Sequence, residues 1–209
     1  MRYWLLLALL AAGCGRAGLD DPVVDDGGPD LGNAGTFAAE VGSLLGGGYE
    51  RLEGSAAFSV VETPGAPPVL ALRLRSIFES VVLPDSLVRD TTYLDLALAQ
   101  AMVPTSGAYT FADIAEVAFA PDTAFVACYR TNVFFDSPYR SAAGTLDLTT
   151  GPEQVAGTFA LEVYTLVPTR SGAADRQALP VRGTFNALAQ PPDTLDAAAL
   201  YRCGAGGAG

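Results

Sequence analysis

Apolar residues alternate with polar or small ones over most of this chain, which is the pattern of β-strands with one buried face. The alternation is clearest in residues 143–187. Side chains two positions apart share a face, so a one-residue shift in strand pairing would move a whole apolar set into water. We therefore expect tightly specified pairing in this stretch. One predicted apolar face consists of Val155, Gly157, Phe159, Leu161 and Val163.

A short signature, Val-x-Gly-Thr-Phe, occurs twice in this stretch, at residues 155–159 and 181–185. Its core is repeated by residues 35–37, Gly-Thr-Phe, near the start of the domain. Recurrence of this kind indicates repeated structural units. A glycine beside a phenylalanine on a buried face predicts a bend, a bulge, or a ring lying over a neighbouring backbone. We interpret the signature as structural rather than catalytic.

The first half of the chain shows the same alternation of apolar and polar residues. Three glycines, residues 46–48, separate two strand-like segments and predict a hairpin. Leucines in residues 70–75 alternate with Ala71, Arg73 and Arg75, which predicts an inward and an outward face. Residues 94–102 fit a strand, although a helix is also compatible with them. The predicted strand segments are residues 36–45, 49–61, 70–75, 94–98, 107–111 and 124–130, together with those of residues 143–187.

These elements predict one all-β domain over residues 35–203, a single antiparallel β-barrel or β-sandwich of roughly eight to ten strands. A short C-terminal helix is expected over residues 193–202, capped by Asp193 or Thr194 and ended by Gly204. Residues 204–209 are expected to form a flexible Gly/Ala tail.

The first 13 residues have the composition of an export signal. Arg2 precedes a continuous apolar run, residues 3–12. This run is shorter than the ~20 residues that span a bilayer but suits the apolar region of a signal peptide.

Residues 10–14, Leu-Ala-Ala-Gly-Cys, resemble the lipobox of bacterial lipoproteins, with alanine at the position three before the cysteine. The resemblance implies cleavage before Cys14, a lipid on its sulfur and an acylated amino end, which together anchor a protein stably. Gly15 stands where an aspartate often signals inner-membrane retention in such lipoproteins, so the outer membrane is favoured. The alternative is ordinary cleavage with Cys14 lost or free.

Residues 14–34 are expected to be the lipidated cysteine and a flexible acidic tether, since Gly, Pro and Asp dominate and no periodicity is present. The aspartates of this stretch raise the hypothesis of a calcium site. Their spacing does not match an EF-hand loop, and a solvated acidic linker is favoured. The aspartates are Asp20, Asp21, Asp25, Asp26 and Asp30.

The charge and composition of the chain exclude several classes of partner and of active site. The net charge of −11 argues against nucleic acid as a partner, because such binding depends on basic groups that neutralise phosphates. All 12 basic residues are arginine, and histidine is absent. A Ser-His-Asp centre, a histidine-bound zinc, a Ser-Lys dyad and a P-loop are therefore excluded.

Carboxylates remain as candidates for catalysis. Asp113 and Glu116 lie three residues apart, and Asp95 and Asp147 lie in strand patterns. Glycoside hydrolysis needs two carboxyl groups at a defined separation, which a sequence cannot supply. Because Asp95 and Asp147 alternate with leucines, we expect them to point outward into solvent. A carboxylate-dependent hydrolase is thus disfavoured; no enzyme activity, metal or cofactor is expected.

Once Cys14 is modified, Cys128 and Cys203 form an even pair in an oxidising export compartment. We expect a disulfide that fixes the predicted C-terminal helix to the sheet. Two unpaired buried thiols are the alternative.

The domain as a whole resembles a class of β-rich bacterial surface lipoproteins, through residues 107–111, residues 144–148 and the two Val-x-Gly-Thr-Phe motifs. The resemblance implies a fold and no activity. The favoured function is a non-catalytic, lipid-anchored binding module of the cell envelope, whose barrel holds a small apolar ligand. An alternative is a structural protein that contacts another envelope protein through an exposed aromatic edge, although large aromatic residues more often cover the end of a core. The residues of that edge would be Phe134, Phe135 and Tyr139.

Overall fold

The computed structural model describes residues 34–43, 48–62, 64–65, 67–83, 86–114, 122–131, 138–169, 174–191, 195 and 203. The expected signal segment, Cys14, the tether up to residue 33 and the tail lie outside these residues. The expected C-terminal helix also lies outside them, apart from Leu195. None of the described segments forms an apolar helix of membrane-spanning length.

Nine β-strands make up the described architecture, so the all-β prediction is confirmed. The second strand has the bounds that the alternation predicted, and residues 94–98 belong to a strand rather than a helix. The strands are β1 (Gly35–Gly42), β2 (Tyr49–Val61), β3 (Val69–Leu83), β4 (Ser86–Leu98), β5 (Gly107–Phe111), β6 (Val126–Thr131), β7 (Tyr139–Thr150), β8 (Gln154–Pro168) and β9 (Ala174–Ala189).

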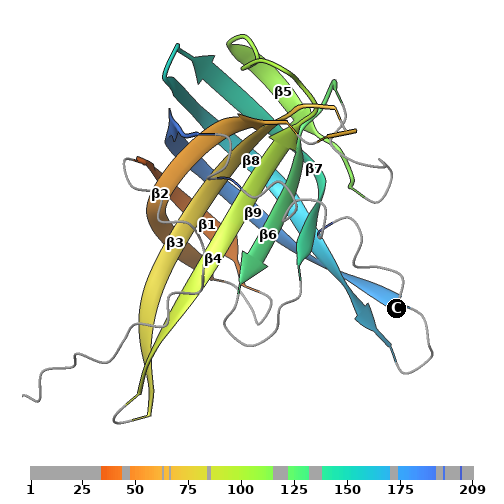
Figure 1. The fold of residues 1–209 in the computed structure, drawn as a ribbon. Coiled ribbons are helices and arrows are strands. Elements are labelled where there is room, and N and C mark those ends of the chain that lie inside the picture. The colour runs from red at the N-terminus through yellow and green to blue at the C-terminus, as the bar shows by residue number, and fades with distance from the viewer. Residues whose placement is uncertain are drawn as a thin grey trace, which may run out of the picture.

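Eight of these strands close into an antiparallel barrel (Figure 1). The order around it is β8-β9-β1-β2-β3-β4-β6-β7, and pairing of β7 with β8 completes the circle. We call the end that carries the β1–β2, β3–β4 and β8–β9 connections the lower end, as drawn in Figure 1. The β3–β4 and β8–β9 hairpins project beyond the barrel there. Of the two predicted architectures, the structure is therefore the barrel.

The contact between β6 and β7 is the shortest in the wall, with only two residue pairs. The ninth strand, β5, pairs with the rest of β7 and joins β6 through a bridge between Phe111 and Phe125. Ser141 stabilises the short contact between β6 and β7. Its buried hydroxyl donates to the carbonyl of Ala112 at 2.7 Å and accepts from the amide of Ala127 at 3.0 Å. A single side chain thus connects β6, β7 and the segment after β5.

Alternate side chains of the barrel strands point inward and form one contiguous core. Leucines from β3 and β4 face phenylalanines from β1, β2, β8 and β9, and each is almost fully buried. Fully burying such a side chain stabilises the fold by about 1.5–3 kcal/mol. The inward phenylalanines are Phe37, Phe58, Phe111, Phe125, Phe159 and Phe185.

The two Val-x-Gly-Thr-Phe motifs pair with each other. In the antiparallel register of β8 and β9, Gly157 lies opposite Phe185 and Phe159 lies opposite Gly183. A Cβ atom at Gly157 would lie 3.0 Å from Cζ of Phe185, so the ring occupies the space that a side chain would need. The third copy follows the same rule: Phe37 pairs with Gly54, whose added Cβ would lie 3.1 Å from its ring. The rings of Phe185 and Phe37 therefore each cover a glycine of the neighbouring strand.

Replacing Gly157 by alanine is expected to destabilise the fold by about 1–3 kcal/mol, since the new methyl group would meet both Phe185 and the carbonyl of Asp147. The matched control is Gly107→Ala in β5, where an added Cβ meets nothing within 4 Å and the change should stay within about 0.5 kcal/mol. Urea unfolding monitored by circular dichroism compares the two. Equal free energies of unfolding for the two variants would contradict the ring-over-glycine packing.

Candidate functional site

The outer face of β3, β4 and β6 carries a cluster of charged residues rather than a solvated surface. Cross-strand pairing sets Arg73 beside Asp95 and Arg75 beside Tyr93 on the outside of the barrel. The expectation that Asp95 is exposed to solvent is wrong: it does point away from the barrel interior, but only 2% of its surface is exposed. Both arginines are buried as well.

The reason is a second apolar cluster that covers this side of the barrel. Small outward residues of β2, β3, β4 and β6 pack there against side chains that lie far away in the sequence. Its fully or nearly fully buried members are Ala57, Val69, Ala71, Ala97, Ile114, Val126, Cys128, Leu195 and Cys203. The barrel is thus packed on both faces of these strands.

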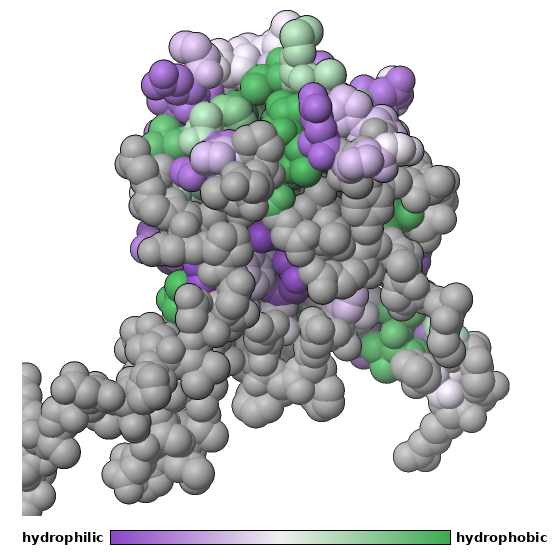
Figure 2. Space-filling view, in the orientation of Figure 1, coloured by the Kyte–Doolittle hydropathy of each residue, from purple (hydrophilic) through white to green (hydrophobic). Residues whose placement is uncertain are grey.

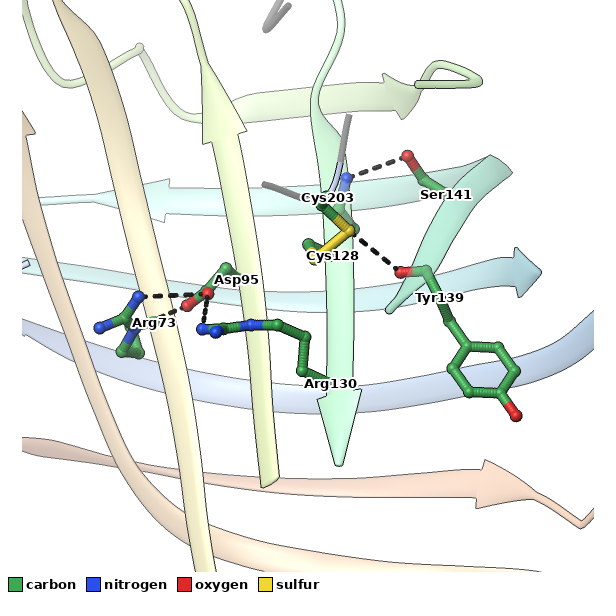
Figure 3. Close-up of a disulfide and its surroundings, with 8 residues drawn as sticks. Arg73, Asp95, Cys128, Arg130, Tyr139, Ser141 and Cys203 are labelled. Atoms are coloured by element: carbon green, nitrogen blue, oxygen red, sulfur yellow. Dashed lines mark hydrogen bonds and ion pairs between the residues drawn. A yellow bond between two sulfur atoms is a disulfide. The ribbon is translucent and has the colours of Figure 1, made fainter. Parts of the chain in front are cut away.

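Asp95 is the centre of the charged cluster (Figure 3). It accepts hydrogen bonds from Nε of Arg73 at 2.7 Å and from the terminal nitrogen Nη2 of Arg130 at 3.0 Å. A second nitrogen of Arg73 lies 3.2 Å from the other carboxylate oxygen, so this pair is bidentate. Charge-assisted bidentate pairs of this kind are strong and geometrically specific.

Tyr93 lies under three guanidinium groups. The central carbons of Arg73, Arg75 and Arg130 lie 5.2, 6.0 and 4.9 Å from the centre of its ring. Cation–π contacts of this type gain strength when they are desolvated. Asp95 is thus paired within the cluster, whereas Nε of Arg75 and Nε of Arg130 are buried without a hydrogen-bond partner in the described structure. We assign the cluster a structural role.

Cys128 and Cys203 form the expected disulfide, with their Cα atoms 5.9 Å apart. Cys128 lies beside Asp95 in the register of β4 and β6, so the bond holds the end of the chain over the charged cluster. Figure 3 shows the two features side by side. Sγ of Cys203 also lies 3.6 Å from the carbonyl oxygen of Tyr139.

The carboxylate of Asp113 accepts hydrogen bonds from two side chains, one on β8 and one on β9. The hydroxyl of Tyr164 in β8 donates to it at 2.8 Å, and Arg176 in β9 donates at 2.6 Å while covering the ring of Tyr164. Burial and this hydrogen bond raise the pKa of Tyr164 above its ordinary value. Glu116, the other carboxylate considered with Asp113, lies outside the described residues, whereas Asp147 is exposed as expected. Within the described part of the chain, no three acidic or cysteine residues gather as a metal site.

The lower end of the barrel interior contains polar groups of a different kind. Tyr129 of β6 points inward and is only 5% exposed, and its ring centre lies 5.8 Å from that of Tyr139. Burial raises the pKa of Tyr129 most, and the carboxylate of Glu50 and Tyr139 raise it further. Tyr129 thus places a polar hydroxyl in an otherwise apolar interior, and we take it as the candidate for ligand contact.

Glu50 lies at the start of β2, and its side chain shares the inward face with Leu52, Gly54 and Ala56. It is exposed, unlike Tyr129. We call Glu50, Tyr129 and Tyr139 the lower-end group.

Tyr139 was one of three aromatic residues considered for an exposed edge. It is half-buried and packs against the main core, so for this residue the alternative that it covers the end of a core is the one observed. Phe134 and Phe135 lie outside the described residues.

No protein-family profile, curated protein or solved structure matches this chain. The candidate site therefore rests on geometry. Of the lower-end group, the sequence singled out only Tyr139, for an exposed aromatic edge. The alternation alone nevertheless places Glu50 and Tyr129 on the inward faces of their strands.

Replacing Asp95 by asparagine should destabilise the fold by about 3–5 kcal/mol, because the buried guanidinium groups of Arg73 and Arg130 would face a neutral amide. Asp147→Asn is the control, since that carboxylate is exposed on β7 and should contribute less than about 0.5 kcal/mol. Thermal and urea unfolding of both variants provide the comparison. A wild-type stability for Asp95→Asn would show that the ion pairs are dispensable.

Reducing the disulfide should lower the free energy of unfolding by about 4 kcal/mol in the chain-entropy model, since the bond joins residues 75 positions apart. Urea unfolding with and without a reductant measures this difference. Cys203→Ser, which cannot form the bond, serves as a reference that the reductant should leave unchanged. An oxidised protein in which both thiols react with iodoacetamide would contradict the pairing.

Proposed function

We propose that the chain is an exported lipoprotein of the bacterial cell envelope, anchored through Cys14 in the outer membrane, whose barrel is a non-catalytic binding module. The lipobox-like residues 10–14 support the anchor. The disulfide supports export, because such bonds persist in oxidising compartments. The acidic residues 15–34 then serve as a tether between membrane and barrel.

One observation carries the binding role: the lower end of an otherwise apolar barrel interior holds two inward-facing residues with polar groups, Tyr129 and Glu50. Binding sites are typically apolar with a few convergent polar groups. The ligand we propose is small, with an apolar part against the inward aliphatic side chains and a polar group at Tyr129. The upper part of the interior is occupied by phenylalanines, so the site belongs to the lower end.

A second candidate function is contact with another envelope protein, favoured by apolar side chains on both projecting hairpins. Ile77 of β3 is 50% exposed and Leu166 of β8 is 46% exposed. Figure 2 shows hydrophobic surface where the β8–β9 hairpin projects and also at the upper end, near β5. Apolar surface on projecting elements is a common feature of protein interfaces.

Native mass spectrometry of the protein taken from its own membrane tests the proposal. We expect an acylated chain beginning at Cys14 that carries a small-molecule adduct. Tyr129→Phe should lose the adduct but keep the acyl groups, whereas Cys14→Ser should be released from the membrane. A chain without acyl groups would refute the anchor, and an adduct-free wild type would refute the small-ligand role. A co-purified protein lost on Ile77→Ser or Leu166→Ser would instead support the second candidate.

A further inference from the structure

One edge of β3 has no partner among the described strands along the β3–β4 hairpin. β3 pairs with β2 only from Val69 to Arg75, whereas its pairing with β4 continues to Leu83. Residues 76–83 are therefore paired on the β4 side alone. The unpaired N–H and C=O groups of such an edge are a template for another strand. This edge is independent of the ligand site proposed above.

A side chain marks the point where β2 and β3 separate. The ladder between the two backbones ends at Arg75, and the hydroxyl of Ser76 then donates to the carbonyl of Glu53 at 2.8 Å. Ile77, the next residue, is exposed. From here the hairpin projects beyond the lower end of the barrel (Figure 1). The free edge of β3 thus lies outside the closed wall, where a further strand can pair with it.

Other free edges at the lower end carry features that discourage strand addition. The part of β4 that β6 leaves unpaired includes Arg89 and Asp90. The part of β9 that β1 leaves unpaired includes Asp175 and Pro180. Charged side chains and proline are common means by which proteins block an edge. These two edges are therefore poor sites for pairing with another chain.

The free edge of β3 has a different composition. Residues 76–83, Ser-Ile-Phe-Glu-Ser-Val-Val-Leu, contain five apolar residues and no proline, and Glu79 is their only charged residue. The register with β4 shifts only between Val81 and Leu83, next to the turn. Short segments of high strand propensity with low charge and no proline are the ones that pair with identical segments. The composition therefore favours a second copy of this chain as the partner.

The pairing of β2 limits how two copies can meet. Because β2 already occupies this edge at Arg75, the turn of an antiparallel partner, at Pro84, can reach no further than Ser76. A two-fold axis at Ser80 meets this limit, since it sets Pro84 of the second copy opposite Ser76. It also gives the longest overlap of the two free edges.

The same register is compatible with the residue types. It sets Phe78 opposite Val82 of the second copy, so apolar residues meet there. Glu79 lies opposite Val81 of the second copy, so the two Glu79 carboxylates are not directly opposite each other. Like charges directly opposite would destabilise the pairing. The edge of β3 is thus complementary to itself.

We propose that two copies of the chain pair through the free edges of β3 and form a two-fold dimer. The two hairpins then make one four-stranded sheet, in the order β4-β3-β3-β4, that connects the barrels. An isolated two-stranded hairpin is marginally stable in water, so this pairing also stabilises the projecting ribbon. Each copy contributes one β3 edge to an isologous contact, so the assembly closes at two copies.

Sedimentation velocity of the full mature chain carrying Cys14→Ser tests the proposal. This substitution removes the proposed acyl groups and so excludes association through lipid. We expect a dimer at protein concentrations up to about 100 μM, in about 0.15 M salt to screen the net charge of −11. Ser80→Lys should weaken the dimer at least about tenfold, because it sets two like charges opposite each other on the axis. Ser86→Lys, the same change on β4 of the same hairpin, should keep it.

A cysteine cross-link tests the axis directly. Ser80→Cys should form a covalent dimer on mild oxidation, whereas Ser86→Cys should not, and circular dichroism verifies that each variant keeps the fold. A monomer at every concentration would overturn the proposal, even if a different protein binds to β3. A dimer that Ser80→Lys leaves intact, or that Ser86→Lys weakens equally, would place the contact elsewhere and overturn it. Assemblies larger than a dimer would contradict the closed two-fold pairing.

Discussion

The interaction on which the rest of the structure depends is the packing of a phenylalanine ring over a glycine in the neighbouring strand. It occurs between β8 and β9 at Gly157 with Phe185, and Phe159 lies opposite Gly183 in the same register. Phe37 and Gly54 repeat it between β1 and β2. A register shift of one residue would place each ring against a side chain on the wrong face. The motif therefore specifies both the pairing of these strands and the space that the core can occupy.

The closed wall then separates two environments. Inside, leucine and phenylalanine fill the upper part, while Tyr129 and Glu50 give the lower end a polar character. Outside, β3, β4 and β6 bear Asp95 and its arginines under a second apolar layer. The disulfide between Cys128 and Cys203 links that outer layer covalently to β6. Asp95 pairs with the arginines around it and stabilises the fold, whereas the lower end of the interior is where we propose that a ligand binds.

Alternation in the sequence was sufficient to predict most strands and the inward leucines of residues 70–75. A ring over a neighbouring backbone was one of three alternatives that the Gly-Thr-Phe signature left open. It could not distinguish a barrel from a sandwich, because closure depends on the pairing of β7 with β8 and on the seam at Ser141, which no local pattern specifies. It placed Asp95 on the correct side of the strand but in the wrong environment. The apolar cluster on this side of the barrel includes Leu195 and Cys203, which come from a part of the sequence that no local pattern connects with Asp95.

The most direct test of this account is the proton NMR spectrum of Gly157 and Gly54. If Phe185 and Phe37 lie over these glycines, ring currents should displace their α-proton resonances strongly from the usual strand range. Cross-strand contacts should also connect Leu146 of β7 with Phe159 of β8, which are paired where the barrel closes. Ordinary glycine shifts together with no contacts between β7 and β8 would contradict both the packing and the closed barrel.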